Sequence, residues 1–270
     1  MSDNSNLKIG IFGFGTMGNA IYSMLKNEFD VQSIYACDHN SDKLSNLPIA
    51  NAIMDGTSLI DKVDIIIIAV KPQDFSEFKK CIKSNNLENK ILLSIMAGIS
   101  IESIKKETGA SKIIRTMPNL ALTVDNGVIG WMKSGTFSPV EAATIVKIVN
   151  KLGFAVEVLN EEMIDKITSI SGSGPAYFYF LAKILEEKAI EFGFSKINAE
   201  RIATDTFLGA AELMKSQNKT PEEMISKIAS KKGTTEAALN TMKENEFVQK
   251  FKEGIDAAFN RSKGLNKSDE

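Results

Sequence analysis

The sequence predicts a protein of the α/β class at its N-terminus, followed by an all-α C-terminal domain. Two observations carry this prediction. Short apolar segments of strand length alternate with helical periodicity over residues 1–160, and helical periodicity alone is found after Pro175. We therefore place the domains at residues 1–160 and 161–270.

Length and composition are those of an ordinary globular protein. The chain has 270 residues, of which 43% are hydrophobic, and a net charge of −2 with basic residues spread along it. This charge gives no electrostatic footprint for nucleic acid or for an anionic membrane, so we expect a small-molecule substrate and further copies of the chain as partners. The longest apolar run, Ile65–Val70, is too short to span a bilayer, and residues 1–6 are polar. We expect a cytoplasmic protein.

A glycine-rich turn follows the first predicted strand, Leu7–Phe12. It reads Gly13-Phe14-Gly15-Thr16-Met17-Gly18 and leads into a helix that continues through Leu25. Gly13 permits a tight turn, Gly15 lets a pyrophosphate approach the backbone, and Gly18 lets the helix pack against the strand. The pattern predicts a Rossmann-like domain that binds a dinucleotide.

An acidic residue stands where such a domain binds the ribose hydroxyls. The second predicted strand, Val31–Cys37, ends at Asp38, twenty positions after Gly18. An aspartate here repels a 2′-phosphate and favours NADH over NADPH. Ser41 and Lys43 follow closely and could bind a phosphate instead, so both cofactors stay open.

Cysteine and histidine are scarce. Cys37 and Cys81 lie in apolar segments and fit buried reduced thiols, and His39 is the one histidine. We therefore expect no metal site. His39 follows Asp38 and is placed at the adenosine end of the cofactor, so an acid in the reaction must come from another residue type or from water.

Further predicted strands bring small and polar residues to one edge of the sheet. Ala69-Val70-Lys71-Pro72 ends one strand, Ala97-Gly98 follows Met96 at the end of a second, and Met117-Pro118-Asn119 ends a third. Together they predict a ligand crevice. The remaining elements of the domain are expected at 49–54 (strand), 57–63 (helix), 127–132 (a late strand, parallel or antiparallel), 139–152 (helix) and 154–159 (strand).

The C-terminal part is predicted to start at the run Gly172–Phe180, with Ser173 as a cap and Pro175 at the first helical position. An ordinary linker-to-helix junction has the same local pattern. Five helices are expected, at 175–191, 198–216, 221–230, 234–243 and 246–263, and the third begins with a capping box from Thr220 to Glu223. The apolar first two helices suggest pairing with a second subunit, and the tail from Ser262 is expected to be loose.

The sequence resembles the pyrroline-5-carboxylate reductase family over nearly its whole length. The resemblance is carried by residues 13–21, 69–73, 97–98, Arg115 with 117–119, Ser-Gly-Ser-Gly-Pro-Ala-Tyr at 171–177 and Gly-Thr-Thr-Glu-Ala at 233–237. It implies NADH- or NADPH-dependent reduction of 1-pyrroline-5-carboxylate to L-proline, the last step of proline biosynthesis. It also implies helical domains that intertwine in a homodimer, with the active site at the dimer interface, and further assembly of such dimers.

The resemblance also implies site residues. Phe12–Met17 would hold the pyrophosphate, Ala69–Pro72 and Met96–Gly98 the nicotinamide end, and Asn119 is counted with the cofactor site. The substrate site would comprise Glu161 and the loop residues Ser230, Gly233, Thr234 and Thr235. The Thr235 hydroxyl would hydrogen-bond the ring nitrogen, and helix N-capping is its alternative role. A protonated cyclic imine is already a strong electrophile, so such a site needs orientation more than a histidine.

Two departures from the family pattern stand out. Lys231-Lys232 replaces Pro-Gly before Gly233, and Leu120-Ala121 replaces Thr-Pro after Asn119. The two lysines could attract a carboxylate or point to solvent. Two other functions remain open: a related Rossmann reductase of another imine or a keto or hydroxy acid, and a non-catalytic nucleotide-binding sensor.

Overall fold

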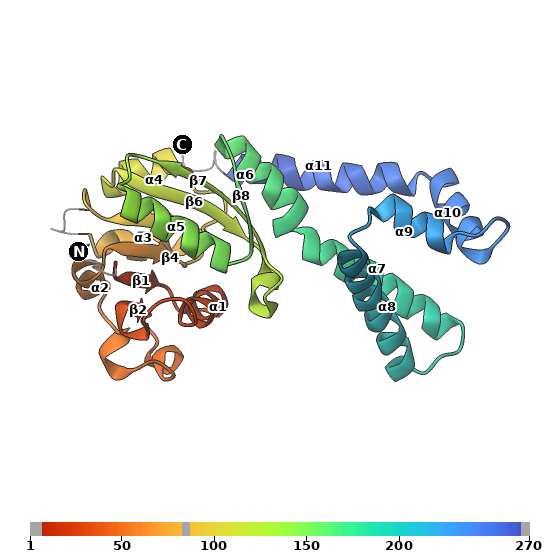
Figure 1. Ribbon diagram of the computed structural model, residues 1–270, viewed down its shortest axis with the longest axis horizontal. Helices are drawn as coiled ribbons and strands as arrows, with labels where there is room; N and C mark the ends of the chain where they lie inside the picture. The colour runs from red at the N-terminus through yellow and green to blue at the C-terminus, as the bar shows by residue number, and fades with distance from the viewer. Residues whose placement is uncertain (1–6, 83–86, 266–270) are drawn as a thin grey trace. The chain divides into compact units, whose positions relative to one another are not determined.

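The computed structural model describes residues 7–82 and 87–265 (Figure 1). Contacts divide the chain into unit 1, which is Met1–Ser173 with Ala258–Glu270, and unit 2, which is Gly174–Ala257. Unit 1 holds the sheet and unit 2 is all helical, as the fold class predicts. The domain boundary at residue 160 stays a prediction, because compactness alone groups residues 161–173 with the sheet.

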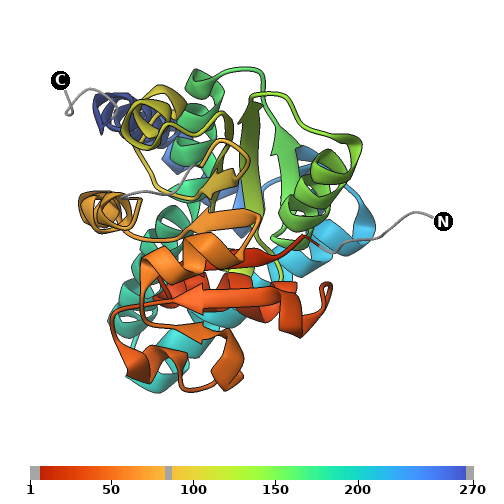
Figure 2. The same ribbon diagram turned by 90° about the vertical axis from the view of Figure 1, so that its left-hand side faces the viewer.

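Unit 1 is built on an eight-stranded sheet of order β3-β2-β1-β4-β5-β6-β7-β8, whose strands can be followed in Figure 2. Neighbouring strands are parallel except β6 and β7, so the late strand is antiparallel to its neighbour β6. In register, Ile9 of β1 lies beside Ile34 of β2 and Ile65 of β4. The strands are β1 Ile9–Phe12, β2 Ile34–Cys37, β3 Ala52–Ile53, β4 Ile65–Ile68, β5 Ile91–Ser94, β6 Lys112–Pro118, β7 Val128–Ser134 and β8 Phe154–Glu157.

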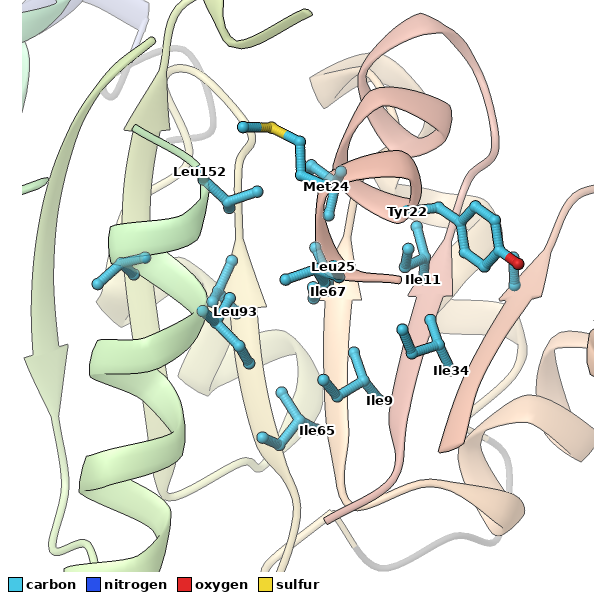
Figure 3. Packing of buried hydrophobic residues seen from close by; sticks show 14 of the residues in the cluster. Ile9, Ile11, Tyr22, Met24, Leu25, Ile34, Ile65, Ile67, Leu93 and Leu152 are labelled. Atoms are coloured by element: carbon cyan, nitrogen blue, oxygen red, sulfur yellow. The ribbon is translucent and has the colours of Figure 1, made fainter. Parts of the chain in front are cut away.

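Both faces of the sheet are covered, which explains the unbroken apolar strands. Alternate residues such as Ile65 and Ile67 face α1 and α5, and this cluster is seen in Figure 3. Ile66 and Ile68 belong to a second cluster, with side chains from α2, α3 and α4. The helices are α1 Thr16–Leu25, α2 Gly56–Lys62, α3 Phe75–Lys80, α4 Ile101–Thr108 and α5 Pro139–Lys151.

Two predicted strands of unit 1 begin with a 3-10 turn in place of their first residues. Residues Val31–Ser33 form a 3-10 turn, because the Asp30 side chain accepts a hydrogen bond from the Gln32 N–H and caps it. Ile49–Asn51 is also a 3-10 turn: Ile49 is 94% exposed, and the buried residue is Asn51, whose side chain donates to the Ile34 carbonyl at 2.7 Å. Short helices α3 and α4 were not predicted, although Ser100 caps α4 and Gly109 ends it in the left-handed conformation.

A helix does begin within the run Gly172–Phe180, at Gly174, as predicted, but it continues an earlier helical path, and the predicted cap at Ser173 is wrong. A helical path already begins at α6, Glu161–Ile167, whose cap is Asn160, and continues through a π-helical turn at Thr168–Gly172 into α7, Gly174–Glu191. Ser173 is right-handed helical and its N–H donates to the Thr168 carbonyl at 2.8 Å, so it does not cap. Pro175 therefore lies within a helical path, which passes through the wide turn just before it.

Unit 2 contains the five predicted helices, with ends within three residues of those expected. They are α7, α8 Lys196–Gln217, α9 Pro221–Ile228, α10 Thr234–Glu244 and α11 Phe247–Leu265, and the capping box of α9 is confirmed. Few of the unit's apolar side chains are buried in the single chain: Ala189, Ala199, Ala203 and Met224. Large apolar side chains such as Phe180, Phe192 and Ile197 are exposed. No described helix is both long and apolar enough to cross a membrane.

The C-terminal segment is more ordered than the sequence predicts. Residues 262–265 belong to α11, and Ser262 is 4% exposed because its hydroxyl donates to Asp165 Oδ1 at 2.8 Å. The prediction of a loose tail from Ser262 is wrong for these residues, and residues 266–270 lie outside the described part. Cys37 and Cys81 are thiols, and burial raises the pKa of Cys37 to about 12.

Candidate functional site

The glycine-rich turn lies at the carboxyl end of β1, where the strand order reverses between β2 and β4. Gly13 has φ +95°, and a Cβ there would come within 2.9 Å of the Ala69 backbone. A Cβ on Gly18 would lie 2.0 Å from the Gly13 carbonyl oxygen. A Cβ on Gly15, in contrast, would meet no atom within 4 Å. Two of the glycines are therefore required by the chain's own packing, and Gly15 leaves space for a ligand.

Helix α1 begins directly after Gly15, which is its N-cap and supplies no side-chain hydrogen bond. The first N–H groups of a helix have no partner within the helix, and they favour an anion. The open space at Gly15 and these N–H groups fit a pyrophosphate. The predicted residues Phe12, Gly13, Gly15, Asp38, Ala69, Val70 and Lys71 line one cleft of about 640 Å³.

Other predicted cofactor residues lie beside this cleft. Phe14 and Thr16 line a neighbouring groove with Gly15, and Phe14 points its ring into the core against Tyr22, so its backbone alone is available. Pro72, Ala97 and Gly98 line a further groove at the ends of β4 and β5. The Met96 side chain is 2% exposed and packs in the core. Met17 and Gly18 belong to α1.

Asp38 is held tightly by the protein itself. Its carboxylate accepts hydrogen bonds from the N–H groups of Phe14 (2.9 Å) and Asn40 (3.0 Å), and Lys43 Nζ lies 3.0 Å from both oxygens. Burial opposes ionisation, but these donors outweigh it and lower the pKa of this carboxyl below its ordinary value of 3.8. Lys43 therefore compensates the charge that would repel a phosphate. The exposed His39 has its Nδ1 3.6 Å from Asp38 Oδ1.

Asn119, predicted to bind the cofactor, uses its side chain within the protein. Its Oδ1 accepts from the Val128 N–H at 3.1 Å, and its Nδ2 donates to the carbonyl (3.2 Å) and hydroxyl (3.1 Å) of Ser171. Pro175 has no N–H with which to reach the Ser171 carbonyl four residues before it. Asn119 therefore supplies a donor that the proline lacks and ties the π turn to the end of β6.

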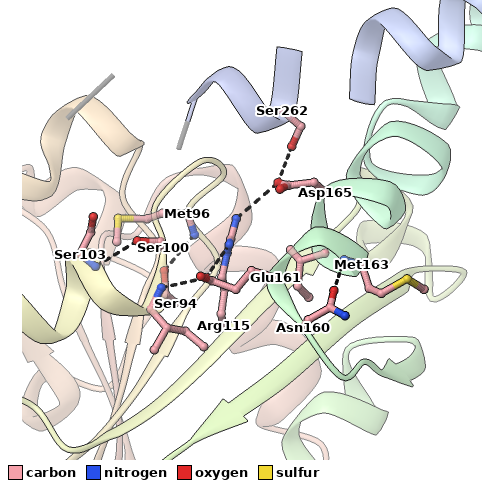
Figure 4. A network of polar contacts seen from close by, with 12 residues as sticks. Ser94, Met96, Ser100, Ser103, Arg115, Asn160, Glu161, Met163, Asp165 and Ser262 are labelled. Carbon is pink, nitrogen blue, oxygen red and sulfur yellow. Dashed lines mark hydrogen bonds and ion pairs between the residues drawn. The ribbon is translucent and has the colours of Figure 1, made fainter. Parts of the chain in front are cut away.

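An ionic network around Arg115 was not predicted (Figure 4). Arg115 is 1% exposed, Nη1 donates to Glu161 Oε1 at 2.6 Å, and Nη2 lies 3.6 Å from Asp165 Oδ1. The same Glu161 oxygen accepts from the Ile101 N–H at 2.8 Å. The sequence signal is an arginine inside an apolar strand, which needs buried acidic partners. Glu161, predicted to be in the substrate site, thus has one oxygen bound within unit 1.

The predicted substrate loop lies in unit 2. The Gly233 N–H donates to the Ser230 carbonyl at 2.9 Å, and a Cβ on Gly233 would lie 2.5 Å from Ser230 Oγ. Lys232 has φ +63° and its N–H donates to Glu236 Oε2 at 2.6 Å. A lysine thus adopts the left-handed conformation that the family's glycine favours. Lys231 and Lys232 are both exposed in the single chain.

Thr234 and Thr235 are the first two residues of α10, and Gly233 is its N-cap. The N-capping role considered for Thr235 is therefore wrong, since the residue lies inside the helix. Thr235 is partly buried. Among the described residues, nothing is hydrogen-bonded to its hydroxyl, which leaves this group available to a ligand.

Comparison with known proteins adds two family matches. Residues 161–265 match the model for pyrroline-5-carboxylate reductase dimerisation, and residues 8–98 match the model for NADP oxidoreductase, coenzyme F420-dependent. A relative named pyrroline-5-carboxylate reductase from Aquifex aeolicus strain VF5 is 33% identical over 96% of this chain and 97% of its own.

Solved structures extend the likeness to the whole fold. A pyrroline-5-carboxylate reductase from Coxiella burnetii has a TM-score of 0.86 at 27% identity, covering 98% of this chain and 100% of its own. The pyrroline carboxylate reductase of Plasmodium falciparum, solved with NADP bound, has a TM-score of 0.82 at 26% identity and covers 97% and 98%.

Proposed function

Because this chain belongs to the pyrroline-5-carboxylate reductase family, we propose that it reduces 1-pyrroline-5-carboxylate to L-proline with NADPH or NADH. The observation that carries the proposal at the site is the glycine turn at the reversal of strand order, with Gly15 open to a ligand. The cofactor, when bound, supplies the hydride. The protein binds and orients the reactants. The cytoplasmic location stays a prediction.

In this proposal the backbone from Phe12 to Met17 and the N-terminus of α1 hold the pyrophosphate. The segments 69–72 and 96–98 bind the nicotinamide end through backbone and small side chains. Asp38 holds the turn through the Phe14 N–H, and it borders the ribose end of the cleft.

Lys43 bears on the choice of cofactor. The ion pair with Asp38 offsets the repulsion that an isolated carboxylate exerts on a 2′-phosphate, and this supports use of NADPH beside NADH. Asp38 without the lysine would favour NADH. Lys43→Met is expected to lower kcat/KM with NADPH more than with NADH, and equal losses would contradict this role.

The loop from Ser230 to Thr235 is proposed to bind the substrate. Its N–H groups at the start of α10 suit the carboxylate, and the hydroxyl of Thr235 donates to or accepts from the ring nitrogen. Lys231 and Lys232 add positive charge within this loop. Glu161 remains a predicted substrate-site residue, through the oxygen not bonded to Arg115. An iminium needs little further activation, and His39 belongs to the cofactor cleft.

We also propose that unit 2 forms a homodimer. Its exposed apolar side chains need cover, since a monomer rarely leaves so many unburied. The match of residues 161–265 to a dimerisation family supports this proposal.

The test is oxidation of NADH and of NADPH with 1-pyrroline-5-carboxylate, with proline identified as product. Thr235→Ala is expected to lower kcat by roughly 10- to 1000-fold while the melting temperature changes little. A wild-type protein that binds cofactor and yields no proline would point to another imine or keto acid if such a substrate is reduced. It would point to a nucleotide-binding sensor if none is reduced.

A further inference from the structure

The chain passes from unit 1 into unit 2 after Ser173 and returns at Ala258. The segments on the unit 1 side of these two crossings are residues 161–173 and 258–265, here called the anchor segments. Both are linked to one buried residue of the sheet, Arg115 of β6. We propose that Arg115 is a positioning residue for the reaction, which anchors both segments to the sheet that carries the cofactor residues.

The first anchor segment is joined to Arg115 by two carboxylates of α6. Glu161 Oε1 is 2.6 Å from Nη1, and Asp165 Oδ1 is 3.6 Å from Nη2. The side chains of Arg115 and Asp165 are 2% and 5% exposed, and two carboxylates of α6 compensate the buried charge of Arg115. The charge-assisted hydrogen bond to Glu161 holds α6 against β6 with more geometric definition than apolar packing provides.

The second anchor segment is joined through Asp165. Its Oδ1 accepts the Ser262 hydroxyl at 2.8 Å, and Ser262 is 4% exposed. Arg115, Asp165 and Ser262 thus form a chain of contacts from β6 through α6 to the last turn of α11 (Figure 4). Loss of Ser262 frees one segment from this chain, and loss of Arg115 affects both.

The consequence for catalysis rests on the proposed function. The proposed cofactor residues belong to unit 1 and Thr235 belongs to unit 2, and the chain crosses from one unit to the other directly after the first anchor segment and directly before the second. A misplacement of about 1 Å in a hydride-transfer geometry can cost about 100-fold in rate. Arg115 contacts neither cofactor nor substrate in this proposal. Its loss should lower kcat and leave cofactor affinity unchanged.

The experiment compares Ser262→Ala, Arg115→Met and the control Ser226→Ala in the full chain. Ser226 is an exposed helical serine whose hydroxyl donates within its own helix, to the Glu222 carbonyl. We would measure kcat, KM and cofactor Kd, together with amide hydrogen exchange by mass spectrometry. Ser262→Ala is expected to lower kcat by about 10-fold and to speed exchange in 258–265, while Arg115→Met speeds exchange in both anchor segments and lowers kcat by up to about 100-fold.

Unchanged kcat in both variants, or a loss of cofactor affinity equal to the loss in kcat, would overturn the positioning role. If Arg115→Met fails to fold, Ser262→Ala decides, because it leaves the Arg115–Asp165 pair in place. If the wild-type chain does not reduce 1-pyrroline-5-carboxylate, the proposed function fails by itself. The exchange data then still test the anchoring: unchanged exchange in both segments would refute it.

Discussion

Gly15 and Gly18 lie three positions apart in one turn, and alanine should have a different effect at each. It should lower stability at Gly18 and cofactor affinity at Gly15. At Gly18 the new Cβ would approach the Gly13 oxygen to 2.0 Å, far inside any carbon–oxygen contact, so the turn or α1 must move. Such overpacking costs about 3 kcal/mol. Better helix propensity at this position in α1 offsets about 1 kcal/mol. The net loss of about 2 kcal/mol corresponds to a melting temperature lower by roughly 4–8 °C.

At Gly15 the backbone has φ −75° and ψ −162°, which alanine adopts without strain, and its Cβ meets no atom within 4 Å. The melting temperature of Gly15→Ala without cofactor should therefore stay close to that of the wild type. Its methyl group would occupy the space assigned to the pyrophosphate, so NADPH affinity should fall by at least about 10-fold.

Thermal unfolding without cofactor and calorimetric titration with NADPH would measure both effects. A Gly18→Ala protein as stable as the wild type would refute the packing argument. Wild-type NADPH affinity in Gly15→Ala would refute the assignment of that space to the cofactor.

Three further predictions follow. Lys232→Gly should raise the free energy of unfolding by roughly 0.5–1 kcal/mol, because glycine adopts φ +63° without the cost that lysine bears; an unchanged urea midpoint would contradict this. The lowered pKa of Asp38 means that its carboxylate stabilises the fold above the ordinary pKa of 3.8 and that this contribution is lost as the pH falls through the folded-state value. Asp38→Asn should therefore be less stable than the wild type at pH 7, with a gap that closes in acid; a gap independent of pH would show that the charge is immaterial. Phe180→Asp should weaken the proposed homodimer, because Phe180 is 62% exposed on α7; sedimentation velocity would measure this, and an undiminished dimer would place the interface elsewhere.

The sequence predicts the sheet well because its strands are buried on both faces. Strands such as Ile65–Ile68 are continuously apolar, and this pattern depends on burial alone. The segment Ile49–Met54 is also largely apolar, but the polar Asn51 interrupts it and Ile49 is 94% exposed, and it forms only the two-residue strand β3. The cap predicted at Ser173 is wrong for a different reason. The helical path that begins at Glu161 runs through Ser173, whose N–H donates to the Thr168 carbonyl, and Asn119 ties the preceding Ser171 to the sheet.

The structural roles of the glycines in the candidate site could be predicted, because a tight turn and close packing depend on local backbone geometry. Gly13 and Gly18 have the roles expected from spacing. The bond from the Phe14 N–H to Asp38 and the network of Arg115 were not predictable, because they join residues far apart in sequence, such as Arg115 with Glu161. A side-chain rotamer or an ion pair depends on the three-dimensional packing, and a single sequence gives no distance between such residues.

The interruption of unit 1 by unit 2 has a consequence for biosynthesis. Ribosomal synthesis proceeds from the N-terminus, so the strands and Asp165 are made first, then all of Gly174–Ala257, and Ser262 near the end. While unit 2 is being made, the Asp165 carboxylate lacks the hydroxyl that later covers it. The sheet can form early with Arg115 already paired to α6. The hydrogen bond from Ser262 to Asp165 can form only once the last turn of α11 has left the ribosome.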